Sequence, residues 1–390
     1  MMYLYTTNYR KLTEIIPRSK ITFNIQVCGP TVYDELHLGH LKTFFFFDVL
    51  VRFLRNLNYN VKFCLNFTDI DENVFEKANE EGCPFNVLAD KISKNTISIL
   101  EKLNINTPNF FPRSSNYIKE YILQIKKLLS QGLAYNVNGN IFFEFNKIYD
   151  RGPVSGFDKS TLYDLRFDSY IGKRAPIDFL LWFKCNSEPN WDSPWGLGRP
   201  GWHLQDVVIA HEMFKGPHDI HGGAIELVCP HHDFIETLGA AIEGIKPYVP
   251  YWVHTCILTI SGKKMSKSLG NIVYVNEILK RFSPETIRIY FLSYPWDEPT
   301  EFSIDQLEVF EDIIKDIKYR IYNLSLSPSN PPDYLIEMKK QFFRHLFNGM
   351  CTSKAVELFI SLVKECSKHH INPSFLEDVL TVLGLETLKS

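Results

Sequence analysis

The sequence lacks several features that would quickly assign it to a class of protein. Its eight cysteines are scattered over 390 residues without a paired spacing or a Cys-x-x-Cys motif, which excludes a disulfide scaffold and favours the reducing cytoplasm. The longest apolar stretch without a charge, residues 248–262, is too short to cross a bilayer, and the first twenty residues lack the apolar core of a signal peptide. A formal net charge of -3 argues against a generally cationic nucleic-acid binder, although it leaves room for a local basic groove.

The chain does contain an alternation of predicted strands and helices. The segments that carry it are a strand (22–28) ending at Gly29-Pro30, a helix (38–57), a strand (61–67), a helix (71–82), a His-Gly-Gly turn within 218–229, a helix (231–244) and a strand (252–260). Strand, Gly-containing turn, helix and strand within about 45 residues are typical of a parallel nucleotide-binding sheet. We therefore predict an α/β fold with a Rossmann-type, doubly wound parallel sheet that is split by an insertion.

The insertion and the C-terminal part differ in character from the sheet. The insertion has a helix at 115–131, a hairpin signal at 137–140 and a Gly/Pro/Trp-rich segment at 186–201. After residue 305 the pattern is helical with a break at 327–332, and residues 306–390 hold ten Lys/Arg against eleven Asp/Glu, so this part has no cationic excess. The predicted domains are the first half of the Rossmann domain (1–111), the insertion (112–198), the second half (199–260), a loop region (261–305) and a helical bundle (306–390).

The most informative segment is CGPTVYDELHLGH at 28–40, which follows a predicted strand and opens a helix. Backbone N–H groups and the positive end of the helix favour phosphate oxygens there. Gly39 has no Cβ, so a ribose or adenine can approach the backbone. His37 and His40 are three residues apart, on one face of the helix start, and can donate to phosphate oxygens. The alternative is that both histidines have only a structural role.

A second segment, SGKKMSKSLGN at 261–271, follows the last predicted strand by one loop. Lys264 and Lys267 lie three residues apart among Gly and Ser, so they form a mobile cationic loop that can close on the phosphates of ATP. A solvated charged loop is the alternative, but it does not explain the pairing with His-x-Gly-His. The two motifs together predict attack of a carboxylate on the α-phosphorus of ATP, a reaction that needs positioning and charge stabilisation rather than a protein nucleophile.

With these motifs, the sequence resembles class I aminoacyl-tRNA synthetases, and specifically the cysteinyl-tRNA synthetase family. The segments that carry the resemblance are VCGPTVYDELHLGH (27–40), NFTDIDENV (66–74), APIDFLLW (175–182), SPWGLGRPGWHLQ (193–205), DIHGGAIELVCPHHD (219–233) and KKMSKSLGN (263–271). The resemblance implies a Rossmann catalytic domain, an inserted domain that holds the acceptor end of tRNA, a stem-contact region and a helical bundle. It also implies ATP with Mg²⁺ as cofactor, and tRNA and an amino acid as partners.

The resemblance also implies roles for individual residues. It assigns catalysis to His37, His40, Lys264 and Lys267. It assigns ATP binding to Gly29, Thr31, Gly39, His221, Gly222, Gly223, Ser266 and Ser268. Amino-acid binding falls to Cys28, Thr68, Trp202 and Glu226, the last at a position that is usually Asp in the family.

The expected metal site is altered. The family selects cysteine through a zinc ion, usually held by two cysteines, a histidine and a glutamate, and zinc prefers the sulfur of cysteine to the hydroxyl of serine. Cys28 and His231 match two of these ligands, but Asp206 and Ile235 stand at the other two positions. Three hypotheses follow. Zinc is held by Cys28, Asp206 and His231; or Cys229 or Glu236 supplies a missing ligand; or zinc is lost and the amino acid is not fixed as cysteine.

The C-terminal part is the second departure, because family members typically continue into a small anticodon-binding domain and this sequence stops at Ser390. The mycothiol-pathway ligase, which joins cysteine to an amine, shares this truncation and the missing zinc-site glutamate. The sequence therefore favours a short cysteine–tRNA ligase, with a ligase acting on a small amine or carrier as the alternative and a non-catalytic RNA-binding paralogue as the weakest hypothesis. We expect a cytoplasmic monomer that does not bind membranes.

Overall fold

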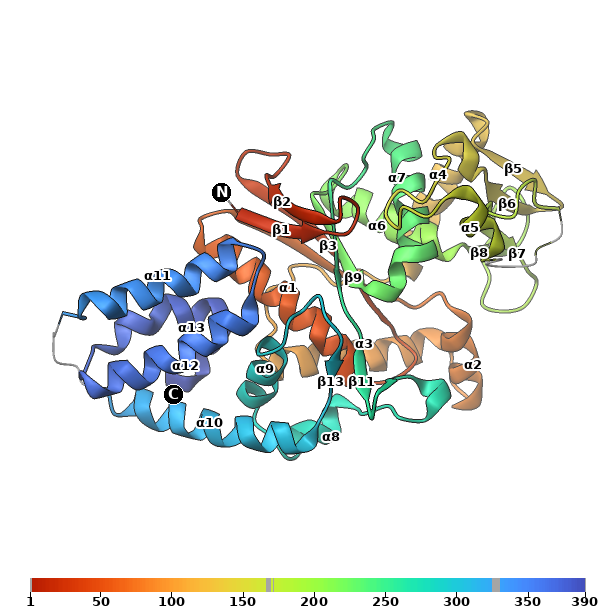
Figure 1. The fold of residues 1–390 in the computed structure, drawn as a ribbon. Coiled ribbons are helices and arrows are strands. Elements are labelled where there is room, and N and C mark those ends of the chain that lie inside the picture. Colours follow the sequence, from red (N-terminus) through yellow and green to blue (C-terminus); the bar gives the residue numbers. More distant parts are fainter. Residues whose placement is uncertain (1, 166–169, 171, 325–329, 390) are drawn as a thin grey trace.

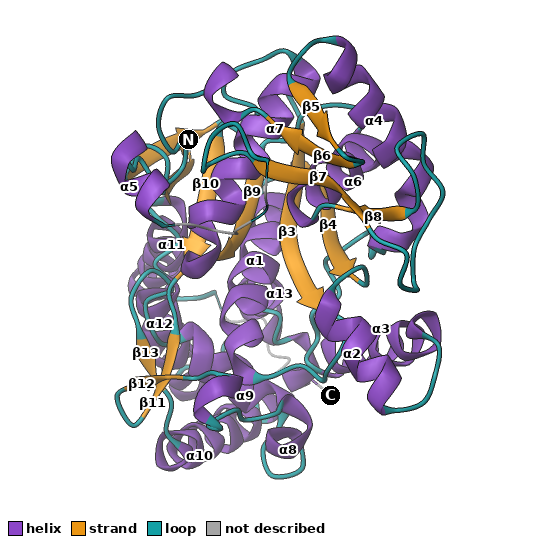
Figure 2. Cartoon of the chain, turned by 90° about the vertical axis from the view of Figure 1, so that its right-hand side faces the viewer, coloured by secondary structure: helices purple, strands orange, loops and turns teal. Residues whose placement is uncertain are grey.

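A four-stranded parallel sheet forms the centre of the fold, with the strand order β10-β9-β3-β4. The computed structural model describes residues 2–165, 170, 172–324 and 330–389. Figure 2 shows the four strands side by side: β10 (Tyr251–Thr255), β9 (Ile220–Ala224), β3 (Thr22–Thr31) and β4 (Asn60–Thr68). The predicted Rossmann-type sheet is confirmed, including the connection from β3 through α1 (Leu38–Asn56) to β4.

Helix α1 is buried around most of its circumference. Its four consecutive phenylalanines, Phe44 to Phe47, are at most 3% exposed, because one side of the helix faces the sheet and the other packs on α9 (Pro284–Leu292) and α13 (Glu377–Leu383). A helix that is apolar all round is typical of such a two-sided environment. The first turn of α1, which carries the two motif histidines, is thereby fixed to the core.

The insertion forms its own antiparallel sheet, β5-β6-β7-β8. Its strands are β5 (Ala134–Val137), β6 (Asn140–Phe143), β7 (Phe179–Lys184) and β8 (Gly198–Pro200). Asn138 and Gly139 both have positive φ, as a two-residue hairpin turn requires, which confirms the predicted hairpin. Figure 1 shows this sheet at the opposite end of the molecule from the C-terminal helices.

The predicted strand 252–260 is wrong as a single element. The chain leaves the parallel sheet after Thr255, and β11 (Leu258–Ile260) belongs to a separate small sheet with β12 (Lys263–Lys264) and β13 (Thr300–Glu301). Ser261 and Gly262, both at positive φ, form the turn between β11 and β12. The lysine motif therefore begins on a hairpin that is paired to β13 rather than on the central sheet.

The C-terminal part is helical, as predicted, and consists of α10 (Ile304–Tyr322), α11 (Asp333–Phe347), α12 (Thr352–Lys368) and α13. The predicted break at 327–332 falls partly on residues outside the described ranges. The remaining elements named in Figure 1 are β1 (Met2–Thr6), β2 (Lys11–Ile15), α2 (Glu72–Glu80), α3 (Phe85–Lys102), α4 (Ile118–Ser130), α5 (Lys159–Asp164), α6 (Trp202–Phe214), α7 (Asp233–Glu243) and α8 (Val275–Leu279). Among the described residues, no helix has the length and apolar character needed to cross a membrane.

Candidate active site

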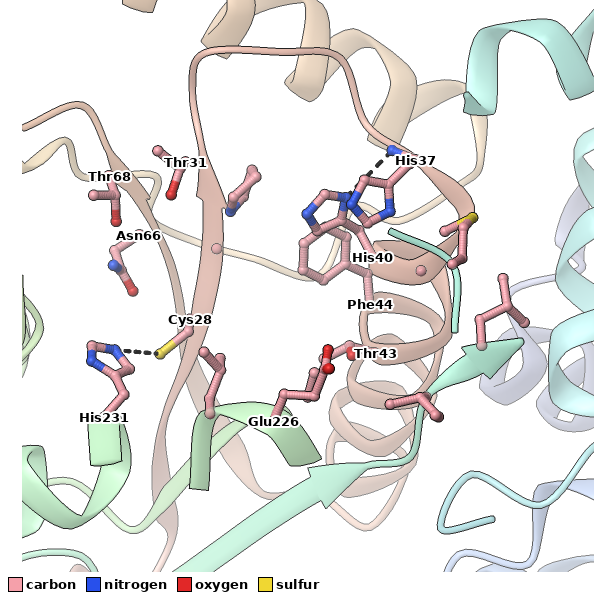
Figure 3. A pocket seen from close by; sticks show the side chains of 18 of the residues that line it. Cys28, Thr31, His37, His40, Thr43, Phe44, Asn66, Thr68, Glu226 and His231 are labelled. Atoms are coloured by element: carbon pink, nitrogen blue, oxygen red, sulfur yellow. Dashed lines mark hydrogen bonds between the residues drawn. The ribbon is translucent and has the colours of Figure 1, made fainter. Parts of the chain in front are cut away.

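A cavity of about 280 Å³ lies at the carboxyl ends of β3, β4 and β9, the edge of a parallel sheet where ligands usually bind. Both sequence motifs reach it, because its lining includes His37, Gly39 and His40 from one and Lys264 and Met265 from the other. Figure 3 shows Cys28, Thr31, Asn66, Thr68 and His231 on one side of the pocket, with His37, His40, Thr43 and Phe44 of α1 opposite them. Gly29, Trp202, Asp206 and Glu226 complete the set of predicted residues that line it.

The two motif histidines are stacked at the start of α1, with ring centroids 3.8 Å apart. The backbone N–H of His37 donates to Nδ1 of His40 over 3.3 Å, so the neutral ring of His40 carries its proton on Nε2 and keeps one donor free. Burial lowers the pKa of His37 to about 4, helped by the Lys267 ammonium, and burial also lowers the pKa of His40. Both rings are therefore neutral at pH 7. The buried Nδ1 of His37 has no hydrogen-bond partner within the described part of the chain.

Each motif lysine is paired with a carboxylate from another segment. Lys264 forms an ion pair with Glu226. Lys267 pairs with Asp34, on the loop before α1, and its ammonium lies 3.8 Å from the ring centroid of Tyr33. Tyr274 also donates to Asp34, over 2.9 Å. Both pairs are partly exposed, so a polyphosphate can compete for the lysines.

Two glycines allow the close approaches that the cavity needs. A Cβ on Gly29 would lie 1.9 Å from the backbone oxygen of Asn66, so any side chain here would force β3 and β4 apart. A Cβ on Gly39 would lie 3.1 Å from both the His37 ring and Cε of Met265. Met265 is buried, so the lysine motif packs directly against the histidine motif at Gly39.

Cys28 lies at the opposite side of the cavity, surrounded by nitrogen and oxygen atoms. Its Sγ is 3.7 Å from Oδ1 of Asp206, 3.8 Å from Nε2 of His231, 3.4 Å from Nε2 of His221 and 3.2 Å from Nε2 of His232. Trp202 stacks on His231, with ring centroids 3.9 Å apart. Burial raises the pKa of the Cys28 thiol, and the nearby Asp206 raises it further. The cluster has the donor atoms that zinc prefers in proteins.

Some predicted site residues do not line the cavity. His221 is fully buried, with its Nδ1 2.9 Å from Nε2 of His218, and a Cβ on Gly222 would lie 2.0 Å from the Phe47 ring. His221 and Gly222, like Gly223, therefore support the cavity from beneath. Lys267 and Ser266 lie beyond its lining, next to Lys264 and Met265. The side chain of Ser268 is outside the described set.

The hypothesis that Cys229 or Glu236 supplies a metal ligand is wrong. The Glu236 carboxylate accepts hydrogen bonds from the backbone of Tyr248 and Val249, the Trp252 indole and the Tyr149 hydroxyl, so it has no free oxygen facing Cys28. Cys229 interacts with Asp233 and packs on the core of the insertion.

The residue that sequence reasoning overlooked is His232, which the two consecutive histidines of the PHH segment could have indicated. Asn66 was overlooked too; its Nδ2 donates to Oδ1 of Asp206 over 2.9 Å.

Comparison with known proteins bears on this geometry. Residues 14–312 match the family described as tRNA synthetases class I (C) catalytic domain. Cysteine–tRNA ligase of Thermococcus gammatolerans is 35% identical over 372 residues, which cover 91% of this chain and 77% of that protein. The same enzyme of Staphylothermus marinus is also 35% identical, over 98% of this chain and 85% of its own length.

This chain belongs to the cysteine–tRNA ligase family. As a member it is an ATP-dependent ligase with a class I synthetase catalytic domain. Solved structures agree on the fold of this ligase: methionyl-tRNA synthetase of Mycobacterium tuberculosis in complex with methionyl-adenylate has a TM-score of 0.67, covering 95% of this chain and 89% of the other, at 14% identity. The leucyl-tRNA synthetase of Agrobacterium radiobacter K84, solved as a ternary complex with tRNA, has a TM-score of 0.65 at 10% identity, covering 95% and 84%. At these identities the structures support the fold alone.

Proposed function

We propose that this ligase activates cysteine with ATP and transfers it to the 3′-terminal adenosine of tRNA. The carboxylate of cysteine attacks the α-phosphorus, the bond to the bridging oxygen breaks, and cysteinyl-adenylate and pyrophosphate form. The ribose hydroxyl of the terminal adenosine then attacks the carbonyl carbon and releases AMP. The observation that carries the proposal is the shared cavity, in which the histidine motif, the lysine motif and Cys28 meet.

The residues of the ATP half act by position and charge. His37 and His40 are neutral, so each has one ring N–H that it can donate to phosphate oxygens. Lys264 and Lys267 exchange their carboxylate partners for the β- and γ-phosphates, where negative charge accumulates as pyrophosphate leaves. Gly39 lets the nucleotide approach the backbone, and Gly29 and Thr31 line the same cavity. Ser266 and Ser268 continue the loop around the phosphates. Mg²⁺ accompanies ATP in this proposal.

The residues of the amino-acid half surround Cys28. Thr68, Trp202 and Glu226 are proposed to contact the amino acid, with the Trp202 ring forming one wall. Glu226 is shared between the two halves, because its carboxylate already pairs with Lys264. When phosphates take Lys264, the carboxylate is freed for the substrate ammonium.

The chemistry of the Cys28 cluster fits a zinc ion. Tetrahedral zinc with one sulfur ligand separates its sulfur and nitrogen ligands by about 3.5 Å, and the distances among Cys28 Sγ, Asp206 oxygens and His231 Nε2 are 3.4–3.8 Å. Oδ2 of Asp206 is buried and accepts no hydrogen bond from any residue that the structure describes. We propose Cys28, Asp206 and His231 as metal ligands. When bound, zinc would favour a thiolate substrate over the hydroxyl of serine.

The proposal is tested by charging of tRNA. Purified ligase is incubated with ATP, Mg²⁺, radiolabelled cysteine and total tRNA, and label is followed into acid-precipitable, ribonuclease-sensitive product. We expect tRNA-dependent product with the unmodified chain and with Lys263→Ala, a substitution next to the motif, and its loss with Lys267→Ala. Adenylate formation without any labelled tRNA would instead indicate a small-molecule acceptor.

A further inference from the structure

The Cys28 cluster contains two ring nitrogens, those of His221 and His232, that the proposed ligand set does not use. We propose that His232 is a further ligand of the metal ion in this ligase, and that it makes good the loss of the carboxylate ligand at the position of Ile235. The inference deepens the proposed function, since it concerns the same amino-acid half of the cavity.

The distances favour metal coordination by His232 at least as strongly as by its neighbour. Its Nε2 is 3.2 Å from Sγ of Cys28, compared with 3.8 Å for Nε2 of His231. Ligand atoms of Cys28, His231 and His232 all lie within 4.8 Å of one another, as the ligands of a single zinc ion must. Ile235 is fully buried and apolar, so it offers no atom to the ion.

The second nitrogen of each ring is hydrogen-bonded in the way that ligating histidines require. Nδ1 of His231 lies 2.8 Å from Nδ1 of His203, and Nδ1 of His232 lies 2.6 Å from Nε2 of His254. Nδ1 of His254 in turn lies 2.7 Å from the Thr7 hydroxyl. Metal-ligating imidazoles almost always bond through their other nitrogen, which fixes the ring and directs the free nitrogen to the ion. The His232–His254–Thr7 chain therefore aims Nε2 of His232 at the sulfur of Cys28.

A second observation points to a cation at this place independently of the histidines. Asp206 is 1% exposed, and its Oδ2 faces His231 at 3.4 Å without accepting a hydrogen bond from a described residue. A buried carboxylate oxygen without a donor is costly unless a cation or a solvent donor satisfies it. Zinc sites can expand to five ligands when substrate binds, so a ligand set of Cys28, Asp206, His231 and His232 leaves a place for a thiolate.

His221 is the competing nitrogen, because its Nε2 is 3.4 Å from Cys28 Sγ. Its nitrogens, like the oxygens of Asp206, lie outside the group of mutually close ligand atoms that Cys28, His231 and His232 form within the described residues. We therefore assign His221 to support of the cluster, and we keep Asp206 as a ligand because its buried Oδ2 has no hydrogen-bond donor among the described residues. A test must separate it from His232.

The test measures metal binding by the full-length chain, apart from activity. Zinc is removed by chelation, and the dissociation constants for Zn²⁺ and Co²⁺ are determined by competition with a chromophoric chelator. We expect one ion per chain, and at least tenfold weaker binding with His232→Gln, because even outer partners of ligating histidines change affinity 10–100-fold. Cys229→Ser should change it less than threefold, and His221→Gln, which removes a support of the cluster rather than a ligand, should weaken it less than His232→Gln does. Each variant is checked for an unaltered metal-free unfolding transition.

X-ray absorption at the zinc edge of the unmodified chain is a second measurement that needs no variant. We expect one sulfur and two imidazole ligands. The assignment would be overturned by a spectrum with one sulfur and one imidazole, or by a chain that takes up no zinc. It would also be overturned if His232→Gln bound zinc as tightly as the unmodified chain, or if His221→Gln lost zinc binding instead. ATP–pyrophosphate exchange in the same preparations distinguishes a failure of this inference from a failure of the proposed function. Exchange by a chain that takes up no zinc, or that binds zinc equally well in His232→Gln, refutes this inference alone, whereas zinc held through His232 without exchange refutes the proposed function alone.

Discussion

Lys264 and Glu226 form an ion pair across the cavity, so that a residue of the lysine motif and a carboxylate of the amino-acid half neutralise each other. Lys267 is held in the same manner by Asp34. Exposed ion pairs of this kind are worth less than about 1 kcal/mol. The phosphates of ATP, with several negative charges, can therefore displace both carboxylates at little cost.

Loss of the Lys267 ammonium should slow activation more than it weakens binding. The charge it meets develops mainly in the transition state, so Lys267→Ala should lower the rate constant of adenylate formation on the order of 100-fold. The KM for cysteine should stay within about threefold. Single-turnover pyrophosphate release measures both quantities, with Lys263→Ala as the matched control. An equal loss in rate and in cysteine affinity would count against a role at the phosphates.

Removal of the His40 ring should depress adenylate formation by two orders of magnitude or more, since a preorganised donor is lost in a buried place. His40→Gln keeps an N–H donor of similar reach and should recover part of the rate, whereas His40→Ala should not. Rapid-quench measurement of adenylate distinguishes them. Near-native rates in His40→Ala would remove this histidine from the site.

The buried histidine His218 should make stability depend on pH. Burial, with a smaller effect from Arg18, lowers its pKa to about 3, whereas in the unfolded chain a histidine titrates near pH 6.5. The unfolded chain therefore binds the proton first, so the contribution of His218 is fully present above about pH 6.5 and is lost as the pH falls. The loss is about 1.4 kcal/mol per pH unit.

This dependence is isolated by comparing the unmodified chain with His218→Gln, both free of metal, in urea unfolding at pH 6.5 and 5.5. Because pH 6.5 is the titration midpoint of the unfolded chain, the unmodified chain should lose about 1 kcal/mol more than the variant over that first unit, and the slope approaches the full value only at lower pH. Titrating groups that do not contact His218 cancel in the difference. Parallel pH dependences would show that His218 is not buried in its neutral form.

Asp48 should be among the residues most important for stability. It is fully buried and accepts hydrogen bonds from Arg288, Arg52 and Thr107 at 2.7–2.8 Å. Burial alone would raise its pKa, but the two guanidinium groups hold the pKa below its ordinary value. Asp48→Asn leaves the buried Arg288 charge without its carboxylate, while Arg52 keeps its pair with Glu386, so we expect a loss of about 3–5 kcal/mol in the free energy of unfolding.

Glu277→Ala is the control for Asp48→Asn, because it removes the exposed pair with Lys280 and should cost less than about 1 kcal/mol. Urea unfolding measures both variants. Similar losses in the two would show that the Asp48 cluster does not join α1 to the C-terminal helices. Arg288 makes that connection by donating to the backbone oxygen of Leu383.

Much of the fold could be predicted because its signals are local. Apolar spacing marked β3, α1 and β4, and the Asn138-Gly139 turn marked the hairpin of the insertion. The strand over 252–260 could not be divided correctly, since an apolar run does not reveal which sheet it joins. Only pairing of β11 with β13, about 40 residues away in sequence, shows that the chain leaves the central sheet.

The site was predictable where motifs carry the chemistry and less so where tertiary packing selects among similar residues. His37 and Lys264 were found from spacing alone. His231 and His232 are adjacent and chemically alike, so their roles depend on which ring nitrogen faces Cys28. Likewise, nothing in the sequence shows that the Glu236 carboxylate is occupied by backbone donors of the segment at 248–249.

The most direct measurement of the central claim is ATP–pyrophosphate exchange screened over the twenty amino acids. If the histidine and lysine motifs and the Cys28 cluster form one activating site, cysteine alone should support rapid exchange, and serine should be rejected by at least two orders of magnitude while zinc is bound. Exchange that is equally fast with several amino acids, or that cysteine does not support, would contradict the account.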